Sequence, residues 1–171
     1  MHGIIDSQAV SERPVISLRR VRAGLRLDSD PLMSHPRLVT TPSRSALMSR
    51  IRGADTKPEI LVRQTLHSLG FRFRIHVRTL PGWPDIVLRR YRLIIQVKGC
   101  FWHSHSCRDG KVPNTNVEYW IPKLLRNQKR DLSNERKLRR LGWSVHSLWE
   151  CRLCRCSPSS LKELLLKIIE R

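Results

Sequence analysis

The segment PDIVLRRYRLIIQVKG, residues 84–99, constrains the fold of this chain most strongly. It contains two short apolar runs separated by a turn at Arg89-Arg90, which is the pattern of a β-hairpin. The second run is rich enough in Leu, Ile and Val to be a central strand that is covered on both faces. The segment therefore predicts a sheet with this hairpin in its core.

The sequence around the hairpin predicts further helices and strands. Residues 56–70 have Thr56 as N-cap, Pro58 in the first turn and Gly70 as the stop, so a helix is expected. Alternating apolar and basic residues predict a strand over residues 71–77. A basic helix over 116–141, interrupted at Pro122, then a strand over 143–150 and a helix over 159–171 complete the domain. The order predicts an α/β sandwich with a mixed central sheet flanked by helices.

The charge of the chain points to a polyanionic partner. Its 171 residues carry 33 Lys and Arg against 14 Asp and Glu, a net charge of +19. Residues 1–40 contribute only +2 of this, with six Arg and four acids, and lack periodicity, so we expect a disordered basic leader before a domain over 41–171. No apolar run approaches the roughly 18 residues that cross a bilayer. Nucleic acid is the expected partner, and the lack of an export signal predicts a cytoplasmic location.

The ends of the hairpin strands carry residues suited to phosphodiester chemistry. Asp85 precedes the first strand and Lys98 ends the second, so a tight turn between the strands brings both to one end of the sheet. A carboxylate and the Val97 carbonyl are hard oxygen ligands for Mg²⁺, and an ammonium can stabilise negative charge that develops on phosphate. This is the logic of PD-(D/E)xK nucleases, here with Gln96 where an acid is usual. A turn aspartate and a solvated lysine are the simpler interpretation.

Two cysteine clusters suggest a metal site. Cys100, His103, His105 and Cys107 share one loop, and Cys151, Cys154 and Cys156 follow the last strand. Zinc prefers four N and S ligands and often joins two distant segments. Two cysteines and a histidine of the loop with one distal cysteine would suffice, as would Cys100 and Cys107 with the pair Cys151 and Cys154. Buried thiols without metal are the alternative. A histidine that zinc does not take is free to act as a base beside Asp85.

Several motifs give the chain a specific resemblance. The segments LPGWPDIVL, GCFWHSHSC, KVPNTNVEYW, NQKRDLSNERKLRRLGW and WEC occur in the order and spacing of the very-short-patch repair endonucleases. The chain resembles this family from about Thr41 to Ile169. The resemblance implies a restriction-endonuclease-like core with a structural zinc site, in a bacterial enzyme at the nucleoid that nicks DNA beside the thymine of a T:G mismatch.

The resemblance also implies a role for each matching residue of the catalytic and metal sites. Asp85 and the Val97 carbonyl are expected to hold Mg²⁺, His103 to be the general base, and Glu59 to support the base or the metal waters. Lys98 stands where the best-known member of the family has a histidine, and is expected to assist catalysis. The expected zinc ligands are Cys100, His105, Cys107 and Cys151. Asp131 matches an acid that orients His103 or pairs with an arginine.

A second group of residues is expected to contact DNA. The resemblance implies that Phe101, Trp102 and Trp120 wedge into the base stack, with Met48 and Ile51 approaching from the minor groove. Opening a mispaired step is cheaper, which favours mismatches. Cations of the long helix, Lys129 and Arg130 among them, are expected to contact phosphates, whereas Trp143 and Trp149 are expected in the core.

The expected substrate is double-stranded DNA with a T:G mismatch, cut by a monomeric enzyme. A cytosine methyltransferase and mismatch-repair proteins are the candidate protein partners, and no membrane is involved. Two other hypotheses stay open: a restriction-type nuclease without mismatch preference, and a non-catalytic zinc DNA-binding module. Cleavage of matched and mismatched duplexes separates the first, and loss of any need for Asp85 and His103 separates the second.

Overall fold

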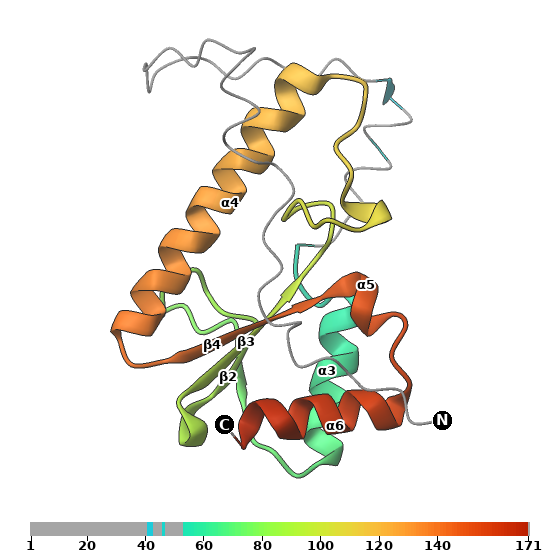
Figure 1. Cartoon of the computed structure of the whole chain (residues 1–171). Helices are drawn as coiled ribbons and strands as arrows, with labels where there is room; N and C mark the ends of the chain where they lie inside the picture. Colours follow the sequence, from blue (N-terminus) through green and yellow to red (C-terminus); the bar gives the residue numbers. More distant parts are fainter. Residues whose placement is uncertain (1–40, 43–45, 47–52, 171) are drawn as a thin grey trace.

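The computed structural model describes residues 41, 42, 46 and 53–170 and has a four-stranded mixed sheet flanked by helices (Figure 1). The expected α/β class is confirmed. The strands are β1 (Arg74–Ile75), β2 (Ile86–Leu88), β3 (Leu93–Lys98) and β4 (Ser144–Trp149), in that order across the sheet. The helices are α3 (Lys57–Ser68), α4 (Val117–Arg140), α5 (Glu150–Leu153) and α6 (Pro158–Ile169), with short 3₁₀ turns at Arg89–Tyr91 and Arg108–Gly110.

The predicted hairpin is present and organises the sheet. Strands β2 and β3 pair antiparallel with Ile86 opposite Ile95, and the turn between them is a 3₁₀ turn with Arg92 in the left-handed region. Strand β4 pairs parallel with β3 from Leu93–Ser144 through Lys98–Trp149. Because parallel neighbours need a long crossover, the loop after β3 and the whole of α4 lie between them in the chain. In the hairpin, antiparallel pairing brings Asp85, just before β2, to the C-terminal end of β3, where Val97 and Lys98 lie.

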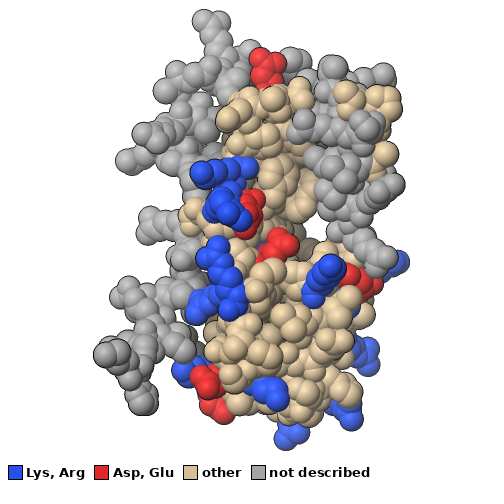
Figure 2. Space-filling model, turned by 90° about the vertical axis from the view of Figure 1, so that its right-hand side faces the viewer, with Lys and Arg blue, Asp and Glu red and all other residues tan. Residues whose placement is uncertain are grey.

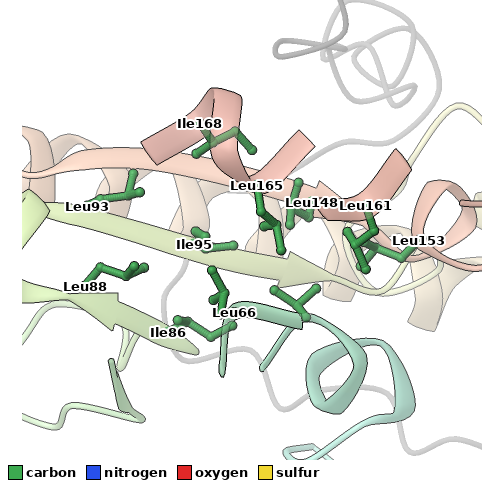
Figure 3. Packing of buried hydrophobic residues seen from close by; sticks show 11 residues of the cluster. Leu66, Ile86, Leu88, Leu93, Ile95, Leu148, Leu153, Leu161, Leu165 and Ile168 are labelled. Carbon is green, nitrogen blue, oxygen red and sulfur yellow. The ribbon is translucent and has the colours of Figure 1, made fainter. Parts of the chain in front are cut away.

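Two apolar layers cover the two faces of the sheet. Helices α3 and α6 pack on one face, where Leu66 and Leu165 meet Ile95 (Figure 3). Helix α4 covers the other face, where Leu138 packs with Ile94 and Val145. Successive residues of β2 and β3 point to opposite faces, and every one from Leu93 to Ile95 is buried. This burial on both sides explains why the second hairpin strand is apolar without alternation.

The strand predicted over residues 71–77 is much shorter than expected, and one of the side chains predicted to face the core faces solvent. Only Arg74 and Ile75 pair with β2, and Ile75 is 43% exposed instead of buried. Phe71 and Phe73 do pack against the α3 side of the core, as the alternation indicated. His76 has a φ of 45°, which turns the chain out of the extended conformation and ends the strand.

The long basic helix is continuous where an interruption was predicted. Pro122 is the sixth residue of α4, and the helix runs on to Arg140 before Gly142 at a φ of 79°. Proline removes one backbone hydrogen bond there, to the Glu118 carbonyl. Trp120 and Leu124 on either side of it are buried, so packing on the domain compensates for the lost bond.

The capped start of α3 is confirmed and positions an acid. Thr56 is the N-cap and Pro58 lies in the first turn. The Thr56 hydroxyl donates to Glu59 Oε1 at 2.8 Å, and the Asp55 N–H donates to Glu59 Oε2 at 3.1 Å. The side chain of Glu59 therefore folds back over the start of the helix and is only 5% exposed, whereas the Thr56 side chain makes no cap hydrogen bond to the helix backbone.

Three predictions concern residues that the structure does not describe. The leader over 1–40, Met48 and Ile51 all lie outside them. In the part of the chain that the structure describes, no helix is both long and apolar enough to cross a membrane.

Truncating the core on the α3 side should destabilise the domain. Leu66 is fully buried against the sheet, so Leu66→Ala is expected to lower the free energy of unfolding by about 2–5 kcal/mol. Leu132→Ala is the matched control, because Leu132 is 48% exposed on α4 and its loss should change stability by less than about 0.5 kcal/mol. Urea denaturation measures both, and equal effects would contradict the assigned core.

Candidate active site and metal centre

A large cleft opens at the end of the sheet where the predicted catalytic residues meet. Its volume is about 1150 Å³. The lining includes Asp85, Gln96, Val97, Lys98, His103, Asp131 and Glu59. Figure 2 shows acidic side chains near the middle of the face it presents, with Lys and Arg side chains beside them. The convergence of the hairpin ends, predicted from the sequence, is confirmed.

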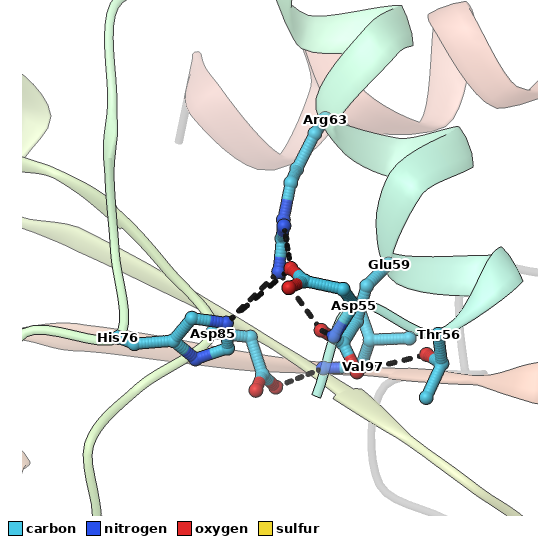
Figure 4. Close-up of polar contacts among 7 residues, drawn as sticks. All are labelled: Asp55, Thr56, Glu59, Arg63, His76, Asp85 and Val97. Atoms are coloured by element: carbon cyan, nitrogen blue, oxygen red, sulfur yellow. Dashed lines mark hydrogen bonds and ion pairs between the residues drawn. The ribbon is translucent and has the colours of Figure 1, made fainter. Parts of the chain in front are cut away.

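Asp85 lies in a position that disfavours its own charge. The Val97 N–H donates to Asp85 Oδ2 at 2.9 Å, which ties the carboxylate to the end of β3 (Figure 4). Burial raises the pKa of Asp85 above its ordinary value; the bond from Val97 opposes this shift, and the nearby charge of Glu59 adds to it. Two half-buried or buried carboxylates beside one another favour a bound cation, because a cation relieves both the burial and the repulsion.

An arginine on α3 holds the second carboxylate in place. Arg63 Nη2 donates to Glu59 Oε2 at 2.8 Å, and Arg63 Nη1 pairs with Asp55. The same Nη2 lies 3.2 Å from His76 Nε2, and the ligand atoms of Asp55, Glu59 and His76 lie within 4.8 Å of one another. Such spacing could hold a metal, yet the guanidinium already pairs with both carboxylates of this trio and offsets one of their two negative charges. Arg63 therefore acts as the internal cation of the group drawn in Figure 4.

A histidine and an aspartate pair across the cleft. His103 Nδ1 contacts Asp131 Oδ2, so the loop after β3 is joined to the middle of α4. A carboxylate accepts the Nδ1 proton, which leaves Nε2 as the basic nitrogen of the ring. Both side chains are partly buried, 23% and 18% exposed. The orienting contact suggested for Asp131 is thus present.

Lys98 lies on an aromatic stack that reaches the cysteine cluster. Its Nζ is 5.8 Å from the centre of the Trp149 ring, and Trp149 stacks on His105 at 4.1 Å. The Trp149 side chain is half-buried there and not in the core where it was expected. Trp143 does pack against the α4 side of the core, with Arg92 over its ring at 4.9 Å.

Three cysteines and one histidine form a compact cluster. The ligand atoms of Cys100, His105, Cys107 and Cys151 all lie within 4.8 Å of one another. Parallel pairing explains this, because Lys98 and Trp149 end their strands at the same level and a cysteine follows each of them two residues later, Cys151 in helix α5. Burial raises the pKa of the Cys100 thiol; burial also acts on Cys107, but hydrogen bonds with His105 and Cys100 lower its pKa to about 7. The cluster could therefore bind a metal.

The structure distinguishes between the two ligand sets left open by spacing. Cys154 is exposed and is not among the clustered residues, and Cys156 packs against the apolar core. The set with His105 is therefore the one that the fold brings together.

The predicted wedge residues form one aromatic cluster. Phe101 and Trp102 are 5.1 Å apart between ring centres, and Phe101 lies equally far from Trp120. Trp102 and Phe101 are partly exposed, whereas Trp120 is 3% exposed and lies beneath them. Lys123 Nζ is 5.5 Å from the Trp102 ring centre, so a cation already lies against the aromatic face.

The two cations expected to contact phosphate lie on different sides of α4. Arg130 lines the cleft, and its side chain is 63% exposed. Lys129 faces outward with Arg136, Lys137 and Arg140 around a shallow hollow. Only Arg130 is therefore positioned beside the predicted catalytic residues.

Some residues of the cleft were not predicted. Arg63 and His76 interact with the acids, Asn134 and Glu150 line the wall, and Trp83 lies at the rim. Arg63 could have been found from its spacing of four residues after Glu59, which favours an ion pair on a helix. His76 and Trp83 both have positive φ, which the sequence does not reveal.

A mixed sheet with carboxylates, a lysine and a histidine at one strand end, in a basic protein, is typical of metal-dependent nucleases. Comparison with known proteins agrees. A family model described as DNA mismatch endonuclease Vsr matches residues 38–109. The DNA mismatch endonuclease Vsr of Escherichia coli is 41% identical over 111 residues, 65% of this chain and 71% of that protein.

Two nicking enzymes are also similar. The type II nicking enzyme V.XorIIP of Xanthomonas oryzae is 47% identical over 110 residues, 64% of this chain and 81% of its own length. V.NmeAIP of Neisseria meningitidis is 42% identical over 116 residues, 68% of this chain and 83% of its own length. The chain belongs to the Vsr family of DNA mismatch endonucleases, and it is therefore a DNA endonuclease.

The geometry of the cysteine cluster predicts which cysteine matters for metal. Cys151→Ser should lower the bound metal, measured by elemental analysis of the purified protein, and should lower the melting temperature, because a structural metal couples binding to folding. Cys154→Ser is the matched control three residues away and should keep both. Equal metal loss in the two variants would move the site to the other ligand set.

Proposed function

We propose that this protein nicks one strand of duplex DNA next to the T of a T:G mismatch, by Mg²⁺-dependent phosphodiester hydrolysis in very-short-patch repair. Membership of the Vsr family supports the reaction, and the names of its relatives support a nick. The observation that carries the proposal is the placement of the His103–Asp131 pair in the same cleft as Asp85. A non-catalytic DNA-binding module would not need a hydrogen-bonded base beside a buried acid.

The acids of the cleft fit a magnesium ion. Glu59 provides carboxylate oxygens in a buried position and Asp85 in a half-buried one, and Val97 provides a backbone carbonyl near the end of β3. These are the hard oxygen donors that Mg²⁺ prefers. Asp85 and the Val97 carbonyl would hold it, with Glu59 reached through water. A Mg²⁺ ion held there would supply Lewis-acid chemistry at the scissile phosphate.

The side chains of the protein supply the proton transfer and the remaining charge. His103 Nε2 takes a proton from the attacking water, and Asp131 holds the ring and stabilises its cationic form through Nδ1. Lys98 offers its ammonium to the phosphate from the strand next to Asp85. The displaced group is the 3′ oxygen, so the products are a 5′-phosphate and a 3′-hydroxyl.

The cysteine cluster fits zinc in a structural role. Three thiols and one imidazole are the donor set of closed tetrahedral zinc sites. Cys100, His105 and Cys107 come from the loop that carries His103, and Cys151 comes from the start of α5, directly after β4. Zinc in this position would hold the catalytic loop to the sheet. His103 is the histidine of this loop that stays available as a base.

Mismatch selection is assigned to the aromatic cluster. Phe101 and Trp102 are partly exposed and would enter the base stack. Trp120 is buried beneath them and would hold the two rings in place as they insert. Its own predicted insertion stays a prediction, as do the roles of Met48 and Ile51. Unstacking costs less at a mispaired step, so a fixed wedge favours T:G over matched DNA.

The setting of the reaction follows the resemblance. We expect a monomeric cytoplasmic enzyme at the nucleoid, with a cytosine methyltransferase and mismatch-repair proteins as candidate partners. A nuclease without mismatch preference is the second candidate function, and the burial of Trp120 is the observation in its favour.

The proposal is tested with end-labelled duplexes that carry T:G or T:A at one position within randomised flanking sequence. Nicking is expected on T:G with Mg²⁺ and is expected to be absent without added Mg²⁺. Asp85→Asn should lower the nicking rate by about 10³-fold or more. Equal cleavage of T:A would support the second candidate, and Mg²⁺-independent cleavage would contradict the assigned metal.

Asp85→Asn should keep the fold. Burial raises the pKa of Asp85 in the folded protein, so the ionised carboxylate destabilises the native state relative to the unfolded chain. The stabilising contribution of the protonated group is complete below the pKa of the unfolded chain and is lost as the pH rises through the raised pKa. Without added Mg²⁺ at neutral pH, the variant should therefore melt at the wild-type temperature or higher, so lost nicking is not lost structure.

The wedge and the phosphate contacts should have different signatures. Trp102→Ala should weaken nicking of T:G by about 1–3 kcal/mol, the usual contribution of one stacked base, with little change in binding of T:A. Lys129→Ala with Arg130→Ala should weaken binding of every duplex and flatten its salt dependence. Metal content must be measured in parallel, because Trp102 lies between Cys100 and His105. Equal losses on both duplexes would exclude Trp102 as a mismatch reader.

A further inference from the structure

Trp83 is an exposed tryptophan that the proposed mechanism does not use. It lies in the loop before Asp85, is 60% exposed and lines the cleft. Pro84 beside it is buried, so the loop itself is anchored while the indole is not. Among the exposed large apolar residues of the described chain, it has the highest exposed fraction. Because its side chain lines the cleft, it is accessible to a ligand that enters there.

The backbone holds Trp83 in a conformation that costs energy. Its φ is 49°, a left-handed value that is uncommon for a bulky residue. Such strain persists only where surrounding structure imposes it, and it clusters at functional sites. Gly82 provides the constraint: a Cβ there would lie 2.6 Å from Asn134 Nδ2, so the loop packs directly against α4. The Trp83 N–H also donates to the Leu80 carbonyl at 3.2 Å.

A cation accompanies the ring. The Arg78 guanidinium lies 5.7 Å from the centre of the Trp83 ring, and Arg78 is itself exposed. An aromatic face with a neighbouring cation is the combination that binds a nucleobase and its phosphate in single-stranded or opened nucleic acid.

Helix α4 gives the distance between Trp83 and the predicted wedge. Asn134 meets the Trp83 loop, and Asn127 donates to the Trp102 carbonyl at 3.2 Å. The two asparagines are seven residues apart, about 10 Å along a helix. Asp131, which contacts His103, lies between them. At about 3.4 Å per step in one strand, this spacing corresponds to roughly three nucleotides.

We propose that Trp83 and Arg78 form a second nucleobase-binding site, which stacks a base about three nucleotides from the wedge and on the other side of the catalytic histidine. The two aromatic contacts would grip the strand on both sides of the phosphate to be cut. This inference rests on the proposed nicking function, because it needs DNA in the cleft.

The test uses Trp83→Gly and Trp83→Phe. Glycine adopts the left-handed conformation without strain, so Trp83→Gly should melt at the wild-type temperature or higher while KM for the T:G duplex rises on the order of tenfold. Trp83→Phe retains a ring and should recover most of the affinity. Tyr91→Ala removes another exposed aromatic, at the hairpin turn, and should leave binding unchanged.

A fluorescent base locates the contact. 2-Aminopurine is placed one to five nucleotides from the mismatch on either side, and binding is measured without Mg²⁺. Quenching about three nucleotides away that disappears in Trp83→Gly is expected. Unchanged quenching and KM in that variant would overturn the site, as would a lower melting temperature with equal damage in Trp83→Phe.

The outcomes separate this site from the proposed function. Quenching that depends on Trp83 on both T:G and T:A duplexes, with no preference in nicking, would retain the site and reject mismatch specificity. Specific T:G nicking that is unaffected by Trp83→Gly would reject the site alone.

Discussion

The parallel pairing of β3 with β4 is the interaction on which the rest of the structure depends. The pairing runs in register to Lys98 and Trp149, so both strands end at the same level of the sheet. On one side of β3, antiparallel pairing brings Asp85 to the Val97 N–H. On the other side, helix α5 follows β4 directly and brings Cys151 to Cys100. A slip of one residue would point these side chains to the wrong faces and separate the acid from the cluster.

Helix α4 sets the spacing of the cleft. Asn127, Asp131 and Asn134 follow one another at four and three residues, so they share one face of the helix. That face contacts the aromatic loop, His103 and the loop before Asp85 in turn. The buried side of the same helix covers the sheet through Leu138. One rigid helix therefore sets the distances between the proposed catalytic residues and the residues proposed to contact DNA. Its packing on the domain keeps it helical through Pro122.

The electrostatics of the site oppose those of the whole protein. The net charge of +19 attracts DNA from a distance, yet Asp85 and Glu59 place negative charge where phosphate must come. Arg63 neutralises part of it from within the protein. The pKa of Asp85 is raised mainly by burial, and the charge of Glu59 adds to this shift. A bound cation removes this conflict. Under the proposed function, affinity for DNA in this cleft is expected to depend on the metal that offsets these acids.

The sequence alone determined the elements with strong local patterns and the chemistry within short segments. The hairpin, the cap at Thr56, and the candidate residues Asp85 and Cys100 follow from apolar runs, turn residues and motif spacing, which act over a few residues. Tertiary structure decided the rest, because it depends on long-range contacts: β1 ends at His76 where the backbone turns to positive φ, and Pro122 is absorbed by packing. Spacing alone left two cysteine sets open and the resemblance favoured the one with His105 and Cys151. Strand register brings that set together and leaves Cys154 outside it.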